Sequence, residues 1–183
     1  MARLPYLNEE DLAEGDKDLL KRGMNLHRLL AHSPEAARRF GSVAQYIRFE
    51  STLDSRLREM AILQVGYLSK SPYEYSHHLR LGRDFGVTDD DVKAMENETA
   101  GNSSSLPELD RTVLRGAREM TNDLKFSDET YDTLRAHLSE AHILDLIMTI
   151  AFYNGVVRLL GALEIDVEPE FQSELDAHPF SKD

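Results

Sequence analysis

The sequence predicts an all-α protein, a compact bundle of about eight helices. Three observations support this fold class. Apolar residues recur at helical spacing in segment after segment. Short polar residues followed by proline or an acidic residue mark helix starts. No segment alternates with the period of two that is typical of a strand. The 183 residues suffice for one sizeable core and contain no dividing linker, so we expect a single domain over residues 1–183.

The first half of the chain is expected to begin with an extended arm over residues 1–8. Gly15 and Gly23 weaken the first helix and are positions where it would divide. Pro34 and Pro72 each follow a serine, as at a helix start. Gly86 is suited to a left-handed residue that ends a helix. We therefore expect helices over about residues 10–31, 34–49, 55–68 and 72–85.

The second half is expected to hold four more helices, which start near Thr88, Pro107, Ser127 and Ser139. Residues 98–105 are rich in Gly, Asn and Ser and predict a loop. The last helix should run over about residues 139–163. It is strongly apolar, but Asp145, Asn154 and Arg158 interrupt it, so we interpret it as buried and not as a membrane span. An acidic tail, residues 164–183, should wrap a surface.

The composition excludes several classes of function. The net charge is −12, with 33 acidic residues against 21 Lys and Arg, which disfavours nucleic acid and anionic membrane surfaces as partners. The chain has no cysteine, so disulfides, thiolate metal sites and cysteine-based peroxidase chemistry are excluded. The N-terminus lacks the apolar segment of a signal peptide, and we expect a cytoplasmic protein.

Glu74 and His78 are the first candidates for catalysis. They lie four residues apart on one predicted helix and therefore project from one face. A carboxylate beside an imidazole fixes the ring tautomer and raises its pKa, which makes a general acid or base near neutral pH. Such pairs also occur on exposed helices as ordinary charge interactions. The pair alone therefore does not identify an active site.

Glu59, on the preceding predicted helix, is the second candidate. It lies in the apolar run Glu59-Met-Ala-Ile-Leu63 and is expected to be at least partly buried. A buried carboxylate needs a partner. His78 is one, and Arg56 and Arg58 are equally available, in which case Glu59 would make an ordinary salt bridge.

The last predicted helix supplies candidates for substrate binding. Arg158 and Asn154 lie one turn apart on it, and an arginine in an apolar helix either pairs with a carboxylate or binds an anionic ligand. We expect them to hold the carboxylate of an acid substrate, with a structural arginine as the alternative. Tyr75 and Tyr153 are expected either in the core or in the lining of the pocket.

A metal site is the alternative to acid–base chemistry. His137 and His142, which flank Glu140, would be the additional ligands beside Glu74 and His78. No HExxH pattern is present. We therefore expect neither a metal nor a cofactor.

Taken together, several segments resemble the carboxymuconolactone decarboxylase / alkyl hydroperoxidase D-like family. The resemblance covers about residues 25–90, and the final helix resembles the C-terminal element of the family. The segments that carry it are Asn25–Pro34, Phe49–Leu53, Arg56–Leu63, Tyr73–His78, Phe85–Val87 and Phe152–Arg158. The resemblance implies an alkyl hydroperoxidase D-like fold and a homo-oligomer, a trimer or hexamer and sometimes a dimer, with active sites near subunit contacts.

The resemblance also separates two branches of the family. In the redox branch a glutamate is followed by a Cys-x-x-Cys pair and a histidine. If Glu59 and His78 are matched to these, the cysteine positions fall on Ser71 and Glu74 of this chain. Thiol chemistry therefore cannot operate here. The pattern Glu74-x-x-x-His78 resembles the decarboxylase-like branch.

The first hypothesis is a cofactor-free decarboxylase-like enzyme, or a related lyase or isomerase, acting on a small organic acid or lactone. His78 would move a proton, Glu74 would orient it, Glu59 would tune the pair, and Arg158 would anchor the substrate. Two alternatives stay open. One is a peroxidase-related protein with peroxiredoxin activity. The other is a non-catalytic binding or assembly protein on the same scaffold.

Overall fold

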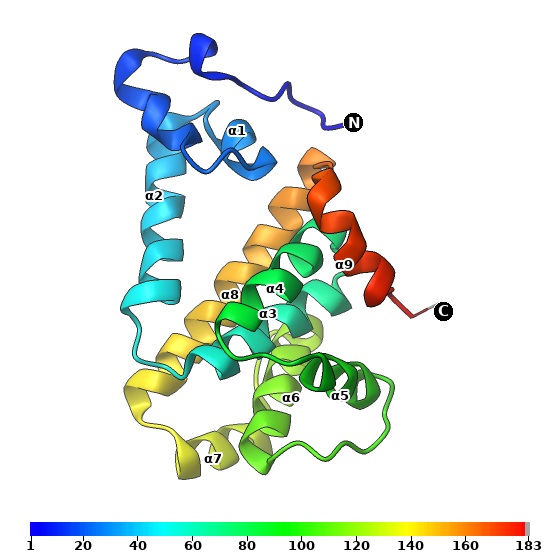
Figure 1. Cartoon of the computed structure of the whole chain (residues 1–183). Coiled ribbons are helices and arrows are strands. Elements are labelled where there is room, and N and C mark those ends of the chain that lie inside the picture. The colour runs from blue at the N-terminus through cyan, green and yellow to red at the C-terminus, as the bar shows by residue number, and fades with distance from the viewer. Residues whose placement is uncertain (182–183) are drawn as a thin grey trace.

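The computed structural model describes residues 1–181, and every regular element within that range is a helix (Figure 1). Short 3-10 helices occupy η1 (Glu9–Asp11), η2 (Glu14–Leu20) and η4 (Pro169–Phe171). The longer elements are α1 (Asn25–Leu30), α2 (Pro34–Gln45), the π-helical turn η3 (Tyr46–Glu50), α3 (Ser55–Leu68), α4 (Pro72–Asp84), α5 (Asp89–Thr99), α6 (Glu108–Asp123), α7 (Asp128–His137), α8 (Glu140–Leu163) and α9 (Gln172–Ala177). The all-α prediction is confirmed.

Helix α3 lies at the centre of the bundle, where it packs against α4, α6 and α8. Every residue from 57 to 67 is buried. A helix surrounded by other helices has no solvent face, which explains why α3 lacks an amphipathic pattern. Polar residues in this run, Arg58, Glu59 and Gln64, are therefore buried with it and need partners inside the protein.

Helix α8 is the longest helix and the second main wall of the core. Its inner face packs against α3, α6 and α7, and it buries nine residues, among them Leu146, Ile150 and Tyr153. By length and composition it is also the one helix of the described part that could cross a membrane. The core helix of a globular bundle meets the same criterion, and only 39% of its most apolar window is buried in the single chain.

Four of the helix starts have side-chain caps, whereas Ser33 and Ser71 make no side-chain cap hydrogen bond, although α2 and α4 begin at Pro34 and Pro72 as predicted. The side chain of Asp54 accepts a hydrogen bond from Leu57 N at 2.9 Å. Thr88 forms a capping box with Asp91. Ser127 and Ser139 likewise accept bonds from backbone amides in the first turns of α7 and α8. Local sequence therefore determines where these helices begin.

The N-terminal region differs from the prediction. The single helix expected over residues 10–31 is replaced by η1, η2 and the short α1. Gly23 has φ 66°, a left-handed conformation that ends the preceding turn and separates η2 from α1. This N-terminal region is held by polar contacts, such as those from Arg38 to Asp16 and Asp18 of η2. In Figure 1 this region and α2 stand on one side of the bundle.

The acidic tail packs along α4, as expected of a segment that wraps a surface. It also contains two short helices, η4 and α9, that the sequence did not predict. Glu174 of α9 binds Arg83 of α4 at 2.8 Å. Phe180 packs against Tyr75, with ring centroids 5.2 Å apart. These contacts place the tail against α4, so that η4 lies next to the site described below.

Candidate active site

His78 is held between two carboxylates. Its Nδ1 lies 2.6 Å from Glu59 Oε2, and its Nε2 lies 3.0 Å from Glu74 Oε1. All three residues are buried, with Glu59 fully enclosed. Arg58 contacts the second oxygen of Glu59 at 3.2 Å. The result is a buried chain of alternating charges that runs from Arg58 through Glu59 and His78 to Glu74.

The close approach of α3 and α4 makes this chain possible. At Gly66, a Cβ atom would lie 3.3 Å from the backbone nitrogen of Tyr75. Such a contact is tight, so the glycine lets the two helix backbones come together. Glu59 on α3 can then reach His78 on α4. The two helices pack extensively along their length.

The charges control the protonation of the site. Burial alone would lower the pKa of His78, but the adjacent Glu59 and Glu74 outweigh it and raise this pKa to about 9. Burial opposes ionisation of Glu59, yet the charges of His78 and Arg58 hold the pKa of Glu59 below its ordinary value. At neutral pH the site therefore contains an imidazolium between carboxylates.

A cavity of about 640 Å³ opens beside this cluster, between α1, α2, α4 and α8. Glu74, His78 and Tyr153 are in its wall. The Tyr153 ring meets the edge of the His78 ring at 86°, with centroids 5.1 Å apart. Burial, followed by the charges of Glu74 and Glu59, raises the pKa of Tyr153 well above its ordinary value, so it stays a neutral phenol.

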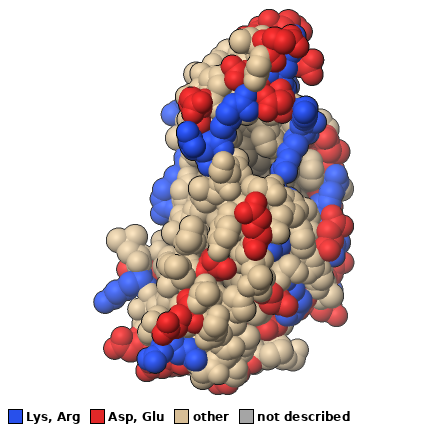
Figure 2. All heavy atoms as spheres, turned by 90° about the vertical axis from the view of Figure 1, so that its left-hand side faces the viewer, with Lys and Arg blue, Asp and Glu red and all other residues tan. Residues whose placement is uncertain are grey.

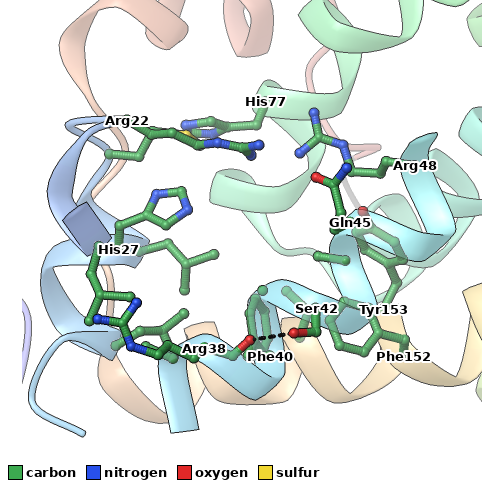
Figure 3. A pocket seen from close by; sticks show the side chains of 18 of the residues that line it. Arg22, His27, Arg38, Phe40, Ser42, Gln45, Arg48, His77, Phe152 and Tyr153 are labelled. Carbon is green, nitrogen blue, oxygen red and sulfur yellow. Dashed lines mark hydrogen bonds between the residues drawn. The ribbon is translucent and has the colours of Figure 1, made fainter. Parts of the chain in front are cut away.

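The rest of the cavity wall is made mainly of apolar side chains, together with a set of cationic or titratable groups. The main apolar side chains are Leu19, Met24, Leu26, Leu30, Phe40, Phe152 and Val156. The cationic or titratable groups are Lys21, Arg22, His27, Arg38, Arg48 and His77 (Figure 3). Figure 2 shows a hollow in the face of the molecule on the α2 side, with Lys and Arg side chains on both sides of it. A cavity of this kind fits an organic anion.

His77 is a cavity residue that the sequence interpretation missed. It stacks between Tyr73 and Phe171, at centroid distances of 4.0 Å and 3.7 Å. Its Nδ1 lies 2.7 Å from the Tyr73 carbonyl oxygen. Its Nε2 lies 3.1 Å from Glu168 Oε2 but makes no hydrogen bond there. The signal was weak, because η4 and Glu168 come from a tail with no recognisable pattern.

The structure brings together only part of the predicted binding set. Tyr153 lines the cavity, whereas Asn154 and Arg158 do not. Asn154 donates to Thr121 Oγ1 at 3.0 Å, and the exposed Arg158 binds back to Asn154 Oδ1 at 2.9 Å. Each residue turns a helix by about 100°, so the neighbour of an inward tyrosine faces elsewhere. The expectation that Arg158 and Asn154 sit beside His78 is therefore corrected.

Tyr75 is also outside the cavity. It is completely buried in a second apolar cluster, and its hydroxyl donates to Glu96 Oε1 at 3.0 Å. Its neighbour Glu74 faces the cavity instead. Tyr75 is therefore a core side chain, which was the alternative that the sequence left open.

The remaining partner alternatives are also resolved by the contacts. Arg58 joins His78 as a partner of Glu59, whereas Arg56 binds Asp91 and Asp110. His142 contacts Thr52, and His137 contacts Glu108, both away from His78. Among residues 1–181, no group of three or more His, Cys, Asp or Glu side chains has the arrangement of a metal site.

The fold is that of the alkylhydroperoxidase AhpD core. A peroxidase-related protein from Ralstonia eutropha JMP134 with this core matches at TM-score 0.74 and 18% identity, over 93% of this chain and 94% of that one. A peroxidase-related protein from Silicibacter sp. TM1040 matches at TM-score 0.71 and 19% identity, over 92% of each chain. The debrominase Bmp8, as a cysteine-to-alanine variant in complex with 2,3,4-tribromopyrrole, matches at TM-score 0.76 and 20% identity, over 91% and 94%.

One segment of the sequence also matches a known family. Residues 34–101 match the sequence model of the Carboxymuconolactone decarboxylase family, and this segment contains Glu59, Glu74 and His78. This segment of the chain is therefore similar to that family, and the predicted resemblance is confirmed. Among curated proteins, no sequence matches the chain significantly.

Proposed function

We propose that the protein is a cofactor-free acid–base enzyme, a decarboxylase-like lyase or a related isomerase, that acts on an organic acid or lactone. The observation that carries this proposal is the Glu59–His78–Glu74 cluster in the wall of a sizeable cavity. The negative charges of two carboxylates keep one buried imidazole protonated. Such an arrangement suits a proton donor that stays charged at neutral pH.

The proposed reaction needs a substrate in which the carbon that bears the carboxylate is conjugated to a carbonyl. When the bond to the carboxylate breaks, carbon dioxide leaves and the electron pair forms an enolate. Nε2 of His78 passes its proton to the Glu74 carboxylate, and the enolate carbon then takes that proton from Glu74, which returns to the carboxylate form. Solvent restores the proton on His78. An isomerase would run the same proton transfer in both directions.

In this proposal the three residues have different parts, and their contacts support the division. Both ring nitrogens of His78 are engaged, so Glu74, which also lines the cavity, is the link between His78 and the substrate. Glu59 is fully buried and contacts only Arg58 and His78 among the described residues. It is a positioning residue that holds the imidazole charged. This division refines the expectation that His78 alone moves the proton.

A thiol peroxidase is the alternative that the named structural relatives suggest. The two cysteine positions of the redox branch fall on Ser71 and Glu74 here, and the chain has no cysteine elsewhere. Glu74 instead has a partner in His78, at 3.0 Å. A peroxide-consumption assay with a thiol donor should therefore give no turnover, and robust turnover would favour the peroxidase.

Proton transfer can be measured before the natural substrate is known. We would incubate the protein in D₂O with a panel of 3-oxo acids and unsaturated lactone acids, and follow deuterium incorporation and carbon dioxide release by NMR. His78→Gln and Glu74→Gln should each lower the rate on any accepted acid by about 10²-fold or more. His137→Gln is the matched control, because His137 lies on α7 and contacts only Glu108. Native rates in His78→Gln would reject the proposal and leave a binding protein.

We also propose that the protein is a cytoplasmic homo-oligomer, a trimer or hexamer or else a dimer, that needs neither nucleic acid nor membrane. The support is an apolar surface on α8 and η3, where Leu144 and Phe49 are 57% and 51% exposed, and Met148 and Tyr46 are 39% and 37% exposed. Sedimentation should give a mass above that of one chain. Leu144→Glu should reduce that mass, and a native protein that sediments as a monomer would contradict the proposal.

A further inference from the structure

The cavity has a cationic side whose charges lack carboxylate partners. Arg22 and Arg48 both line it, and among residues 1–181 neither forms a salt bridge. The chain has 33 acidic residues for 21 Lys and Arg, and most of its other arginines are paired. Arg38 in the same wall, for example, binds Asp16 and Asp18. Two guanidinium groups without a carboxylate partner therefore line one cavity, with Arg22 exposed and Arg48 partly buried.

Unsatisfied polar atoms gather on the same side. Only five buried side-chain nitrogen or oxygen atoms in the described residues lack a hydrogen bond. Two of them, Arg48 Nε and His27 Nδ1, belong to residues of this cavity wall that form no salt bridge with a carboxylate, whereas His77 Nε2 and Glu168 Oε2 face each other at 3.1 Å. Buried polar groups without partners are costly, and a cluster of them at one place points to a missing ligand.

The cationic groups also lie close to one another. In Figure 3 the guanidinium groups of Arg22 and Arg48 point toward the same part of the pocket, near His77, with His27 below them. Burial, followed by the charges of Arg22 and Arg48, lowers the pKa of His27 to about 4, against the opposing charge of Glu168. Both guanidinium groups are therefore near enough to His27 to affect its charge. An anion among these groups would relieve their mutual repulsion.

We infer that Arg22, Arg48 and His27 form a subsite for the carboxylate of an organic acid that also has a sizeable apolar body. Guanidinium groups match a carboxylate with paired, charge-assisted hydrogen bonds. Phe40, Phe152 and Val156 supply apolar surface in the wall of the same cavity, which also contains Tyr153, a ring in contact with His78. The subsite replaces the anchor that Arg158 was expected to provide.

The size of the cavity sets the substrate class. About 640 Å³ lies well within the range of sites that enclose drug-sized ligands, which is roughly 300–1,000 Å³. An acid of only a few atoms would leave most of the apolar wall in contact with water. Aryl-substituted or medium-chain acids would fill it. This inference rests on the proposed function for the chemistry, but the binding it describes does not require turnover.

The test compares an acid with its neutral analogue. We would titrate the full chain calorimetrically with 4-phenylbutanoate and with 4-phenylbutan-1-ol, which share the apolar body and differ in the charged group. The native protein should bind the acid at least about tenfold more tightly than the alcohol, since one hydrogen bond to a charged group is worth that factor. Equal affinities, or no binding of the acid, would overturn the inference.

Variants locate the anion. Arg22→Gln and Arg48→Gln should each weaken binding of the acid by about tenfold to a hundredfold and leave the alcohol unchanged. Arg39→Gln, the same change on an 84% exposed side chain of α2, should alter neither affinity. If the Arg22 and Arg48 variants bind the acid like the native protein, the carboxylate lies elsewhere. If a variant fails to fold, the two ligands can be titrated into the native protein at increasing salt concentration. Added salt should weaken binding of the acid and leave binding of the alcohol unchanged.

Two further arms separate this inference from the proposed function. Glu74→Gln should lose proton transfer but keep its affinity for the acid. Tight binding of the acid without any turnover of the acid panel would support the subsite and reject the enzyme. Turnover of the acid panel, together with equal binding of 4-phenylbutanoate and 4-phenylbutan-1-ol, would support the enzyme and reject the subsite. Inorganic phosphate, as a third ligand, should bind much more weakly than 4-phenylbutanoate, since it lacks the apolar body, and equal binding would contradict the assigned ligand class.

Discussion

The two charged regions of the cavity differ in how their charges are satisfied. In the first, Arg58, Glu59, His78 and Glu74 form a closed chain in which each charge has an opposite neighbour. In the second, Arg22 and Arg48 line the same cavity and neither forms a salt bridge with a carboxylate among residues 1–181. The charges of the first region are neutralised within the folded chain, whereas those of the second would be neutralised by the ligand that we infer. The partners of a charged side chain therefore distinguish a structural charge from one that can bind a ligand.

The largest expected effect of a substitution is at Glu59. Glu59→Gln leaves the buried Arg58 and His78 without the carboxylate that both contact. Breaking one side of a buried ion pair costs about 3–5 kcal/mol, and urea denaturation should detect a loss of that order in the free energy of unfolding. Glu35→Gln, on the exposed pair of Glu35 and Arg39, is the matched control and should change stability by less than about 1 kcal/mol. Similar stabilities of the two variants would mean that the buried chain of charges is not structural.

The second effect is a dependence of stability on pH. The folded-state pKa of His78, about 9, lies above the ordinary value of 6.5. A raised pKa means that folding favours the protonated form, so this contribution is fully present below pH 6.5 and is lost as pH rises through 9. It amounts to at most about 3 kcal/mol. The stability difference between native protein and His78→Gln, measured by urea denaturation, should shrink across that window, and a constant difference would contradict the assignment.

The third effect tests the tight packing that holds the paired region together. In Gly66→Ala, the new Cβ would meet the Tyr75 backbone at 3.3 Å, so α3 and α4 would have to separate slightly. We expect a loss of about 1–3 kcal/mol in the free energy of unfolding, together with slower proton transfer. Gly155→Ala on α8, where nothing lies within 4 Å of the new Cβ, should be neutral or stabilising. A neutral Gly66→Ala would show that the helix spacing is not critical.

The smallest effect concerns the unpaired region. Burial lowers the pKa of His27 to about 4, followed by the charges of Arg22 and Arg48. Removal of one charge by Arg22→Gln should therefore raise the pKa of His27 by a fraction of a unit, which NMR titration of the ring can detect. The free energy of unfolding should fall little or not at all, in contrast to Glu59→Gln. No shift in the pKa would place Arg22 away from His27.

Much of the fold follows from local sequence. Caps at Thr88, Ser127 and Ser139 fix the helix starts that were predicted there, and Asp54 caps α3 in the same way. The N-terminal region was predicted as one helix, because apolar spacing alone does not distinguish an α-helix from 3-10 turns. The tail helices were missed because their stability comes from packing on α4. Local sequence therefore predicts the helices that do not depend on packing against distant segments.

The site was predictable along one helix and not across helices. Glu74 and His78 are four residues apart, so their pairing follows from helix geometry. The contact of Glu59 with His78 was one of three sequence alternatives and needed the spacing of α3 and α4 to be chosen. Arg22 and Arg48 come from segments that sequence could not place around one cavity. The prediction that Arg158 anchors the substrate was wrong, because its side chain faces away from the cavity, beside Asn154.

The π-helical turn at the end of α2 has a consequence for how this cavity could change. Arg48 lies in η3, Tyr46–Glu50, where a π turn holds one residue more than an α turn. Loss of a single residue from this turn would restore a regular helix and rotate the side chains on one side of it by about 100° relative to the other. Arg48 would then leave the cavity wall while the packing of α3 stayed intact. A one-residue deletion would thus be enough to alter which ligands the pocket accepts.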